Sequence, residues 1–157
     1  MEEVLKLTQF TFNSLLILQL GADYIEDAAT FYGEAGDCYE KTEPKKAIEN
    51  LQKAIYIYTE KDMFNDVAHR QLKVAKLLES ENDRPSALLH YEIAGEFFKR
   101  FISGEVPWYD QDMVKHSKKL LSECVKKTAE YAVQQGFYEK AIQIYEQVRI
   151  KTHLTYY

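Results

Sequence analysis

The side chains most often used in catalysis and metal binding are present in this sequence, but none lies in a recognisable motif. A helical metal site needs two histidines about one turn apart, and a nucleophilic serine or cysteine needs a base at motif spacing. The histidines lie singly on separate segments, and the two cysteines have neither metal-binding nor redox spacing. The residues concerned are His69, His90, His116, His153, Cys38 and Cys124. No glycines cluster into a phosphate-binding loop, so we expect no enzyme activity and no cofactor.

Lysines offer a different chemistry, because they are arranged on one face of a segment with helical periodicity. In "MVKHSKKLLSECVKKTAEYA" (113–132), four lysines fall within an arc of about 100° on a helical wheel. Apolar side chains occupy the opposite side. The arc contains Lys115, Lys118, Lys119 and Lys126, and the opposite side contains Met113, Leu120, Cys124 and Tyr131. Such a stripe attracts an acidic partner, although lysine-rich helix surfaces are also common as ordinary solvated faces.

The overall charge limits which partners the chain can have. The net charge is −5, with −5 in residues 1–80 and zero in residues 81–157. This distribution argues against a nucleic-acid binder, so an anionic partner has to use a local basic stripe. The opening "MEEVLKL" lacks the positive charge of a signal peptide, and the apolar run "SLLILQL" at 14–20 is too short to span a membrane. We therefore expect a cytoplasmic protein with at most peripheral membrane association.

A small residue followed seven positions later by another small residue recurs along the chain. Seven residues make two helical turns, so each pair marks one line along one helix face, where a neighbouring helix can approach closely. The first four pairs begin 19, 21 and 19 residues apart, and large aromatic residues recur beside them. A hairpin of two helices therefore takes about 40 residues, as in helical-repeat proteins. The pairs are Ala28/Ala35, Ala47/Ala54, Ala68/Ala75 and Ala87/Ala94, with looser copies at Ser117/Cys124 and Ala141/Val148.

Turn signals separate the predicted helices. Pro44 and Pro85 suit first helical turns, Asp62 offers a cap to the helix that follows it, and Gly136 ends the penultimate helix. We predict helices over about 3–21, 25–41, 44–60, 64–80, 84–102, 110–135 and 137–149. The expected fold is all-α: a right-handed antiparallel helix-hairpin solenoid, similar to tetratricopeptide repeats, with about seven helices in a single domain over 1–157.

Three segments resemble the alpha/beta branch of the soluble NSF-attachment protein (SNAP) family. They are "DAATFYGEAGDCYEKTEPKKAIENLQKAIYIYTEKDMFNDVAH" (27–69), "SALLHYEIAGEFF" (86–98) and "AEYAVQQGFYEKAIQIYEQV" (129–148). The resemblance implies a non-enzymatic adaptor of vesicle trafficking. Such an adaptor binds the SNARE four-helix bundle and helps to recruit a hexameric AAA ATPase that disassembles the bundle. Only the central portion of the family pattern is covered.

The resemblance also assigns candidate contacts, and the sequence departs from the family at some of them. Lys41 and Lys127 fall where the family has basic contacts to the acidic SNARE surface. Met63, His69 and Glu123 stand at three other such places. The alternative is therefore a general helical-repeat scaffold that binds a peptide or helix unrelated to SNAREs, and a third reading is self-association through the terminal helices.

Overall fold

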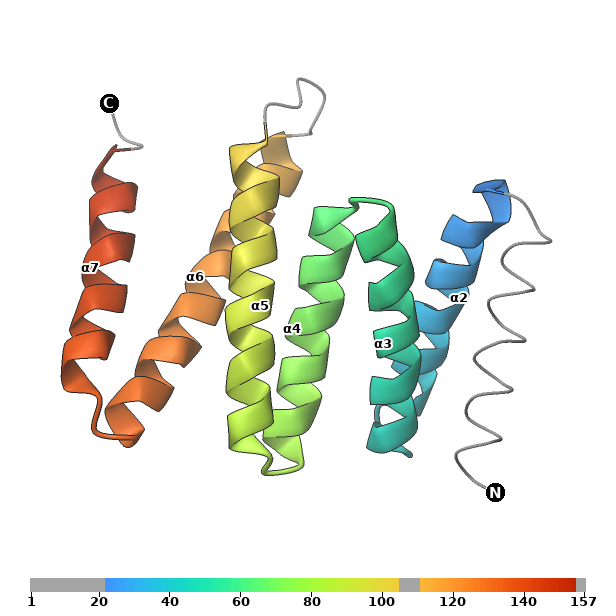
Figure 1. Cartoon of the computed structure of the whole chain (residues 1–157), viewed down its shortest axis with the longest axis horizontal. Helices are drawn as coiled ribbons and strands as arrows, with labels where there is room; N and C mark the ends of the chain where they lie inside the picture. Colours follow the sequence, from blue (N-terminus) through green and yellow to red (C-terminus); the bar gives the residue numbers. More distant parts are fainter. Residues whose placement is uncertain (1–21, 105–110, 155–157) are drawn as a thin grey trace.

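A computed structural model describes residues 22–104 and 111–154 of the chain, and these residues are almost entirely helical (Figure 1). Within them there are six helices and no strand. The helices are α2 (Ala22–Tyr39), α3 (Pro44–Glu60), α4 (Phe64–Ser80), α5 (Arg84–Ser103), α6 (Gln111–Gln134) and α7 (Tyr138–Leu154).

Successive helices run antiparallel and form two layers (Figure 1). In one layer α4 lies between α2 and α6, because Lys73 Nζ of α4 is 2.6 Å from Asp37 Oδ1 of α2 and Lys76 Nζ is 2.8 Å from Glu123 Oε1 of α6. In the other layer, Lys140 of α7 reaches Glu92 of α5. This arrangement confirms the predicted helix-hairpin solenoid.

The predicted helix boundaries agree with the structure within a few residues, except at the end of α7. That helix continues to Leu154, five residues beyond the predicted end at 149. The helix predicted over 3–21 lies outside the described residues.

Three of the turns share one conformation, and it corrects the predicted role of Asp62. Asp62, Asn82 and Gly136 have φ of 54°, 62° and 80°, and each lies just after the C-terminal end of a helix. After α3, the N–H of Met63 donates to the carbonyl of Tyr58, and the N–H of Asp62 donates to that of Thr59. This is the Schellman pattern, which needs a left-handed residue that Gly adopts freely and Asn or Asp adopts more readily than other residues. Asp62 therefore ends α3, and the prediction that it caps α4 is wrong.

The caps of α3 and α5 follow the prediction more closely. Proline occupies the first turn of each helix, where its missing N–H leaves no helical hydrogen bond unmade. In α5 the Asp83 carboxylate accepts a hydrogen bond from the N–H of Ser86 at 3.3 Å. This bond satisfies one of the free donors at the helix start.

The small-residue pairs mark the lines along which helices pack, with one change of register. Both alanines are fully buried in the pairs of α3, α4 and α5, and Ser117 and Cys124 are buried in α6. In α2, however, Ala28 and Ala35 are only half-buried, and Ala29 and Gly36 form the buried line. A Cβ on Gly36 would lie 2.8 Å from Leu51 Cγ. The glycine lets α3 approach closely, so the contact line passes through Gly36 rather than Ala35.

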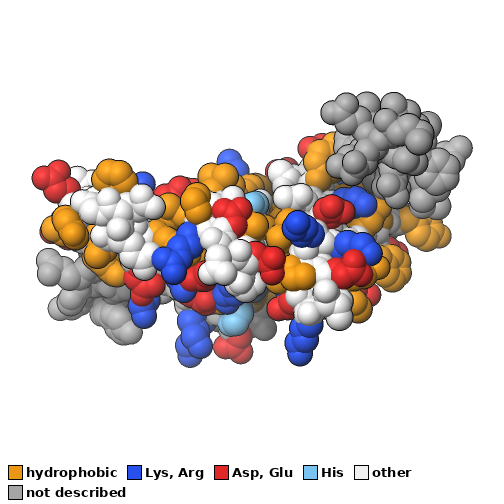
Figure 2. All heavy atoms as spheres, turned by 90° about the horizontal axis from the view of Figure 1, so that it is seen from below, with side chains coloured by type: hydrophobic (Ala, Val, Ile, Leu, Met, Phe, Trp, Pro, Cys, Tyr) orange, Lys and Arg blue, Asp and Glu red, His pale blue; other side chains and the backbone are white. Residues whose placement is uncertain are grey.

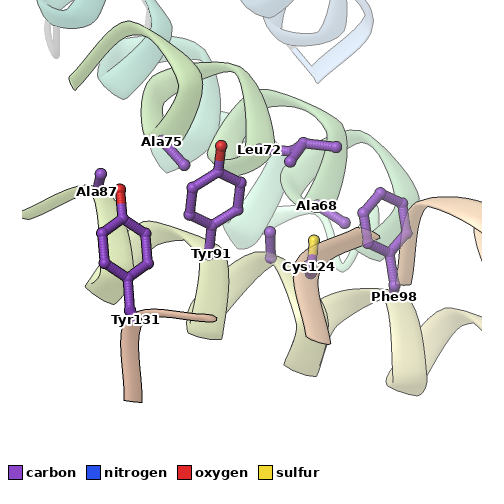
Figure 3. Packing of buried hydrophobic residues seen from close by; sticks show 9 residues of the cluster. Ala68, Leu72, Ala75, Ala87, Tyr91, Phe98, Cys124 and Tyr131 are labelled. Carbon is purple, nitrogen blue, oxygen red and sulfur yellow. The ribbon is translucent and has the colours of Figure 1, made fainter. Parts of the chain in front are cut away.

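The largest core cluster lies between α4, α5 and α6 (Figure 3). Tyr91 and Phe98 of α5 point between the small residues of α4 and the side chains of α6, and both are fully buried. Burial of one such ring contributes about 2–3 kcal/mol. The cluster therefore fixes the position of α6, which carries the lysine stripe, relative to α4 and α5.

A candidate partner-binding face on helix α6

The lysine stripe predicted on α6 lies on the solvent-exposed side of the helix. Lys115, Lys118, Lys119 and Lys126 are all exposed, whereas Cys124 and Tyr131 on the opposite side are buried in the core cluster. The packing of α6 against α4 and α5 thus separates a core side from a basic side. Met113 was expected on the core side but is 44% exposed. It lies in the first turn of α6, and the buried residues of this helix begin only at Ser117.

The last two lysines of the stripe region already have carboxylate partners. Lys126 Nζ lies 3.9 Å from Glu130 Oε1, and both side chains are well exposed, so this pair contributes little stability. Lys127 Nζ donates to Glu79 Oε1 of α4 at 2.8 Å, and both side chains are only 33% exposed.

Glu79 joins three helices through its hydrogen bonds. Its second carboxylate oxygen accepts a 2.7 Å bond from the hydroxyl of the buried Tyr91 of α5. Burial alone would raise the pKa of Glu79, but the bonds from Lys127 and Tyr91 outweigh it, so the pKa is lowered. The hydrogen bond to Glu79 in turn raises the pKa of Lys127, and burial raises the pKa of Tyr91. Lys127 is therefore a charged part of the internal packing.

Nothing in the sequence singles out the contact between Glu79 and Lys127, because 48 residues separate the two. The same region forms an open polar depression of about 160 Å³ between the α4–α5 turn and the second half of α6. Its lining residues carry both signs of charge: Glu79, Asn82, Arg84, Lys127, Glu130, Tyr131 and Gln134. Since Lys127 is already paired with Glu79 there and Glu130 adds a second negative charge, this depression is not a selective anion site.

Lys41 lies apart from the other candidate lysines. It is exposed in the turn between α2 and α3, and α4 separates α2 from α6 in their layer (Figure 1). Figure 2 views the end of the molecule that holds the α2–α3, α4–α5 and α6–α7 turns. Positive and negative side chains alternate over this end. The structure therefore does not bring Lys41 and Lys127 into one continuous basic surface.

The resemblance implies basic contacts at three further positions, and none of them carries a free positive charge. These positions are Met63, His69 and Glu123. Glu123 pairs with Lys76, and Met63 packs against the core cluster that contains Ala54 and Val67. His69 stacks on His116 with ring centroids 5.8 Å apart. Burial, and next the neighbouring His116, lower the pKa of His69, so the ring is neutral at pH 7.

Two further properties of the described residues bear on function. Across 22–104 and 111–154 no group of three or more His, Cys, Asp or Glu side chains could hold a metal ion. No helix in the same ranges has the length and apolar character needed to cross a membrane.

Comparisons with known proteins connect this geometry to a family. A family model described as "Soluble NSF attachment protein, SNAP" matches residues 10–155. The mouse alpha-soluble NSF attachment protein is 37% identical over 134 residues, which cover 85% of this chain and 40% of the mouse protein. The bovine beta-soluble NSF attachment protein is 35% identical over 127 residues, covering 80% of this chain and 38% of the relative.

A viral protein is similar over an even larger part of the chain. The soluble NSF attachment protein homolog FPV033 of fowlpox virus is 30% identical over 147 residues, which are 92% of this chain and 46% of the viral protein. The chain thus spans less than half the length of the curated relatives it matches.

Proposed function

Because the chain belongs to the soluble NSF attachment protein family, we propose that it is a non-enzymatic adaptor that docks on the acidic surface of a SNARE four-helix bundle. It then helps to recruit the hexameric AAA ATPase that takes the bundle apart. The observation that carries the proposal is the exposed lysine stripe of α6, held on a two-layer helical solenoid.

The fold supports this role through its rigidity. The Tyr91 and Phe98 core and the Glu79 bonds connect α6 to α4 and α5, so the helix that carries the exposed lysines is held in one position. A preorganised surface loses less conformational entropy on binding than a flexible one. Opposite charge on the partner mainly accelerates the encounter, and salt weakens this effect.

Recruitment of the ATPase is the second part of the proposal. The relatives are named NSF attachment proteins, and this chain spans about two fifths of their length. SNARE binding and ATPase recruitment are therefore separate activities to test. The ATPase part is measured by adding the chain to NSF and an assembled bundle with ATP, and faster disassembly with the chain than without it is the expected result.

The test of docking uses the complete 157-residue chain and an immobilised, fully assembled SNARE bundle. We expect capture at low ionic strength and strong loss of capture at high ionic strength, with a net-neutral helical bundle as the control surface. Capture that is equal on both surfaces and insensitive to salt would contradict the proposal.

The alternative, a helical-repeat scaffold for a peptide or helix unrelated to SNAREs, rests on a specific observation. Lys127 is paired internally, and Glu123 and His69 stand where the resemblance implies basic contacts. Salt-insensitive binding of an apolar helical peptide, together with no capture by the SNARE bundle, is the result that supports this alternative.

A further inference from the structure

The lysines of α6 differ in whether a carboxylate already lies against them. Lys115, Lys118 and Lys119 have no hydrogen bond or ion pair within the part of the chain that the structure describes. Lys127 is held by Glu79 at 2.8 Å, and Lys126 lies 3.9 Å from Glu130. An incoming carboxylate can reach the first three without displacing an existing partner.

The local charge balance follows the same division. Residues 111–120 of α6 carry three lysines and one acid, Asp112, so their net charge is 3 − 1 = +2. Residues 121–134 carry two lysines and two glutamates, with a net charge of zero. Beside the second half of α6, the α4 side chains that pair with it, Lys76 and Glu79, also sum to zero.

We propose that the first half of α6, through Lys115, Lys118 and Lys119, makes the direct contacts to the acidic bundle, and that Lys127 makes none. This inference rests on the proposed function and deepens it. It departs from the family resemblance, which implies a contact at Lys127. That residue instead stabilises the junction of α4, α5 and α6.

The spacing of the three lysines suits a helical partner. Positions three and four residues apart lie one turn apart on the same helix face, about 6 Å along the axis from Lys115 to Lys119. A partner helix with acidic side chains one turn apart would present its carboxylates at a similar interval, so two or three pairs could form together.

The test compares double variants of the full chain on the assembled SNARE bundle. K115Q/K119Q removes two unpaired lysines from the proposed surface. K45Q/K53Q removes the same net charge from exposed positions of α3, which belongs to the other layer. K76Q/E123Q deletes one complete ion pair between α4 and the second half of α6 and leaves the net charge unchanged.

We expect K115Q/K119Q to lower the association rate several-fold at low ionic strength, with the difference vanishing at high ionic strength. We expect K45Q/K53Q and K76Q/E123Q to associate at close to the wild-type rate. Far-UV circular dichroism should show equal helix content in all four proteins, because every substituted side chain is partly or fully exposed.

The possible failures are distinguishable. If the wild type binds and K115Q/K119Q binds equally fast, or no more slowly than K45Q/K53Q, the inference is wrong and the proposed function stands. If the wild type does not bind the bundle, both are wrong. In a third outcome, the wild type binds phosphatidylserine vesicles but not the bundle, and K115Q/K119Q does not bind the vesicles. That outcome would assign the surface to a membrane and overturn the inference.

Discussion

Helices α5 and α7 share one sequence pattern, but their surroundings differ. Both carry small residues at helical spacing beside large aromatic ones. In α5, the small residues and the rings of Tyr91 and Phe98 are fully buried between α4 and α6. In α7, Ala141 is buried, but Tyr138, Ile142 and Tyr145 are exposed, and so is Phe137 just before the helix.

The difference shows what an amphipathic pattern determines. The pattern fixes which side of a helix is apolar, but burial requires neighbouring helices on that side. Helix α5 is covered by both α4 and α6, whereas α7 packs mainly on α6. The same residue types should therefore contribute very differently to stability in the two helices, and matched substitutions can measure this.

The largest difference is expected for phenylalanine. Phe98→Ala removes a fully buried ring and should lower the free energy of unfolding by about 3–5 kcal/mol. Phe137→Ala removes a ring that is 61% exposed and should change it by no more than about 0.5 kcal/mol. Urea unfolding followed by circular dichroism measures both. Similar losses for the two variants would show that the apolar face of α7 is as well covered as that of α5.

The two cysteines extend the comparison to chemical reactivity. Cys124 is buried in the core cluster, and burial raises the pKa of its thiol to about 12. Cys38 is exposed on α2. Because only the thiolate reacts, a maleimide at pH 7.5 should label Cys38 at least about 100-fold faster than Cys124. Equal rates in the folded protein, with Cys38→Ser as the control for assignment, would contradict the close packing of α5 on α6.

A smaller loss is expected when the Glu79 bonds are removed. Glu79→Ala leaves the buried hydroxyl of Tyr91 without its acceptor and Lys127 without its ion pair. The expected cost is about 1–2 kcal/mol, reduced because Glu79 and Lys127 are partly exposed. Glu139→Ala makes the same chemical change at an exposed site in the first turn of α7 and should cost only its interaction with the helix dipole, about 0.5 kcal/mol. A cost for Glu139→Ala as large as that for Glu79→Ala would refute the role given to Glu79.

The smallest expected effect is a dependence of stability on pH. Burial lowers the pKa values of His69 on α4 and His90 on α5. Near pH 6.5 and just below it, the unfolded chain therefore binds more protons than the folded one, so stability falls as the pH decreases. Urea unfolding between pH 7.5 and 5.5 should show this fall, and His69→Gln should make it shallower. An unchanged slope in His69→Gln would mean that the packing of His69 against Phe98 and His116 does not control its protonation.

Much of the fold could be predicted from sequence because its signals are local. The alanine pairs of α3, α4 and α5, the prolines at helix starts and Gly136 each act within a few residues of themselves. The lysine stripe of α6 was predictable for the same reason, since it depends only on helical periodicity.

The features that could not be predicted depend on residues far apart in the chain. The ion pair between Lys127 and Glu79 joins positions 48 residues apart, and without it Lys127 is indistinguishable from the free lysines. The buried line of α2 passes through Gly36 because Leu51 of the next helix packs there. Asp62 was misassigned because the same residue type suits both a helix cap and a left-handed turn.

The central claim is that the basic face of α6 meets the acidic bundle, and the exposed apolar face of α7 is the competing surface. The most direct measurement is photo-crosslinking to an assembled SNARE bundle after replacing either Ser122 or Ile142 with a photoreactive amino acid. Ser122 lies among the lysines of α6, Ile142 lies on the exposed apolar face of α7, and both positions are exposed. We predict adducts with the bundle from position 122 that disappear at high ionic strength, and none from position 142. Adducts from position 142 alone, or from neither position at low ionic strength, would contradict the claim.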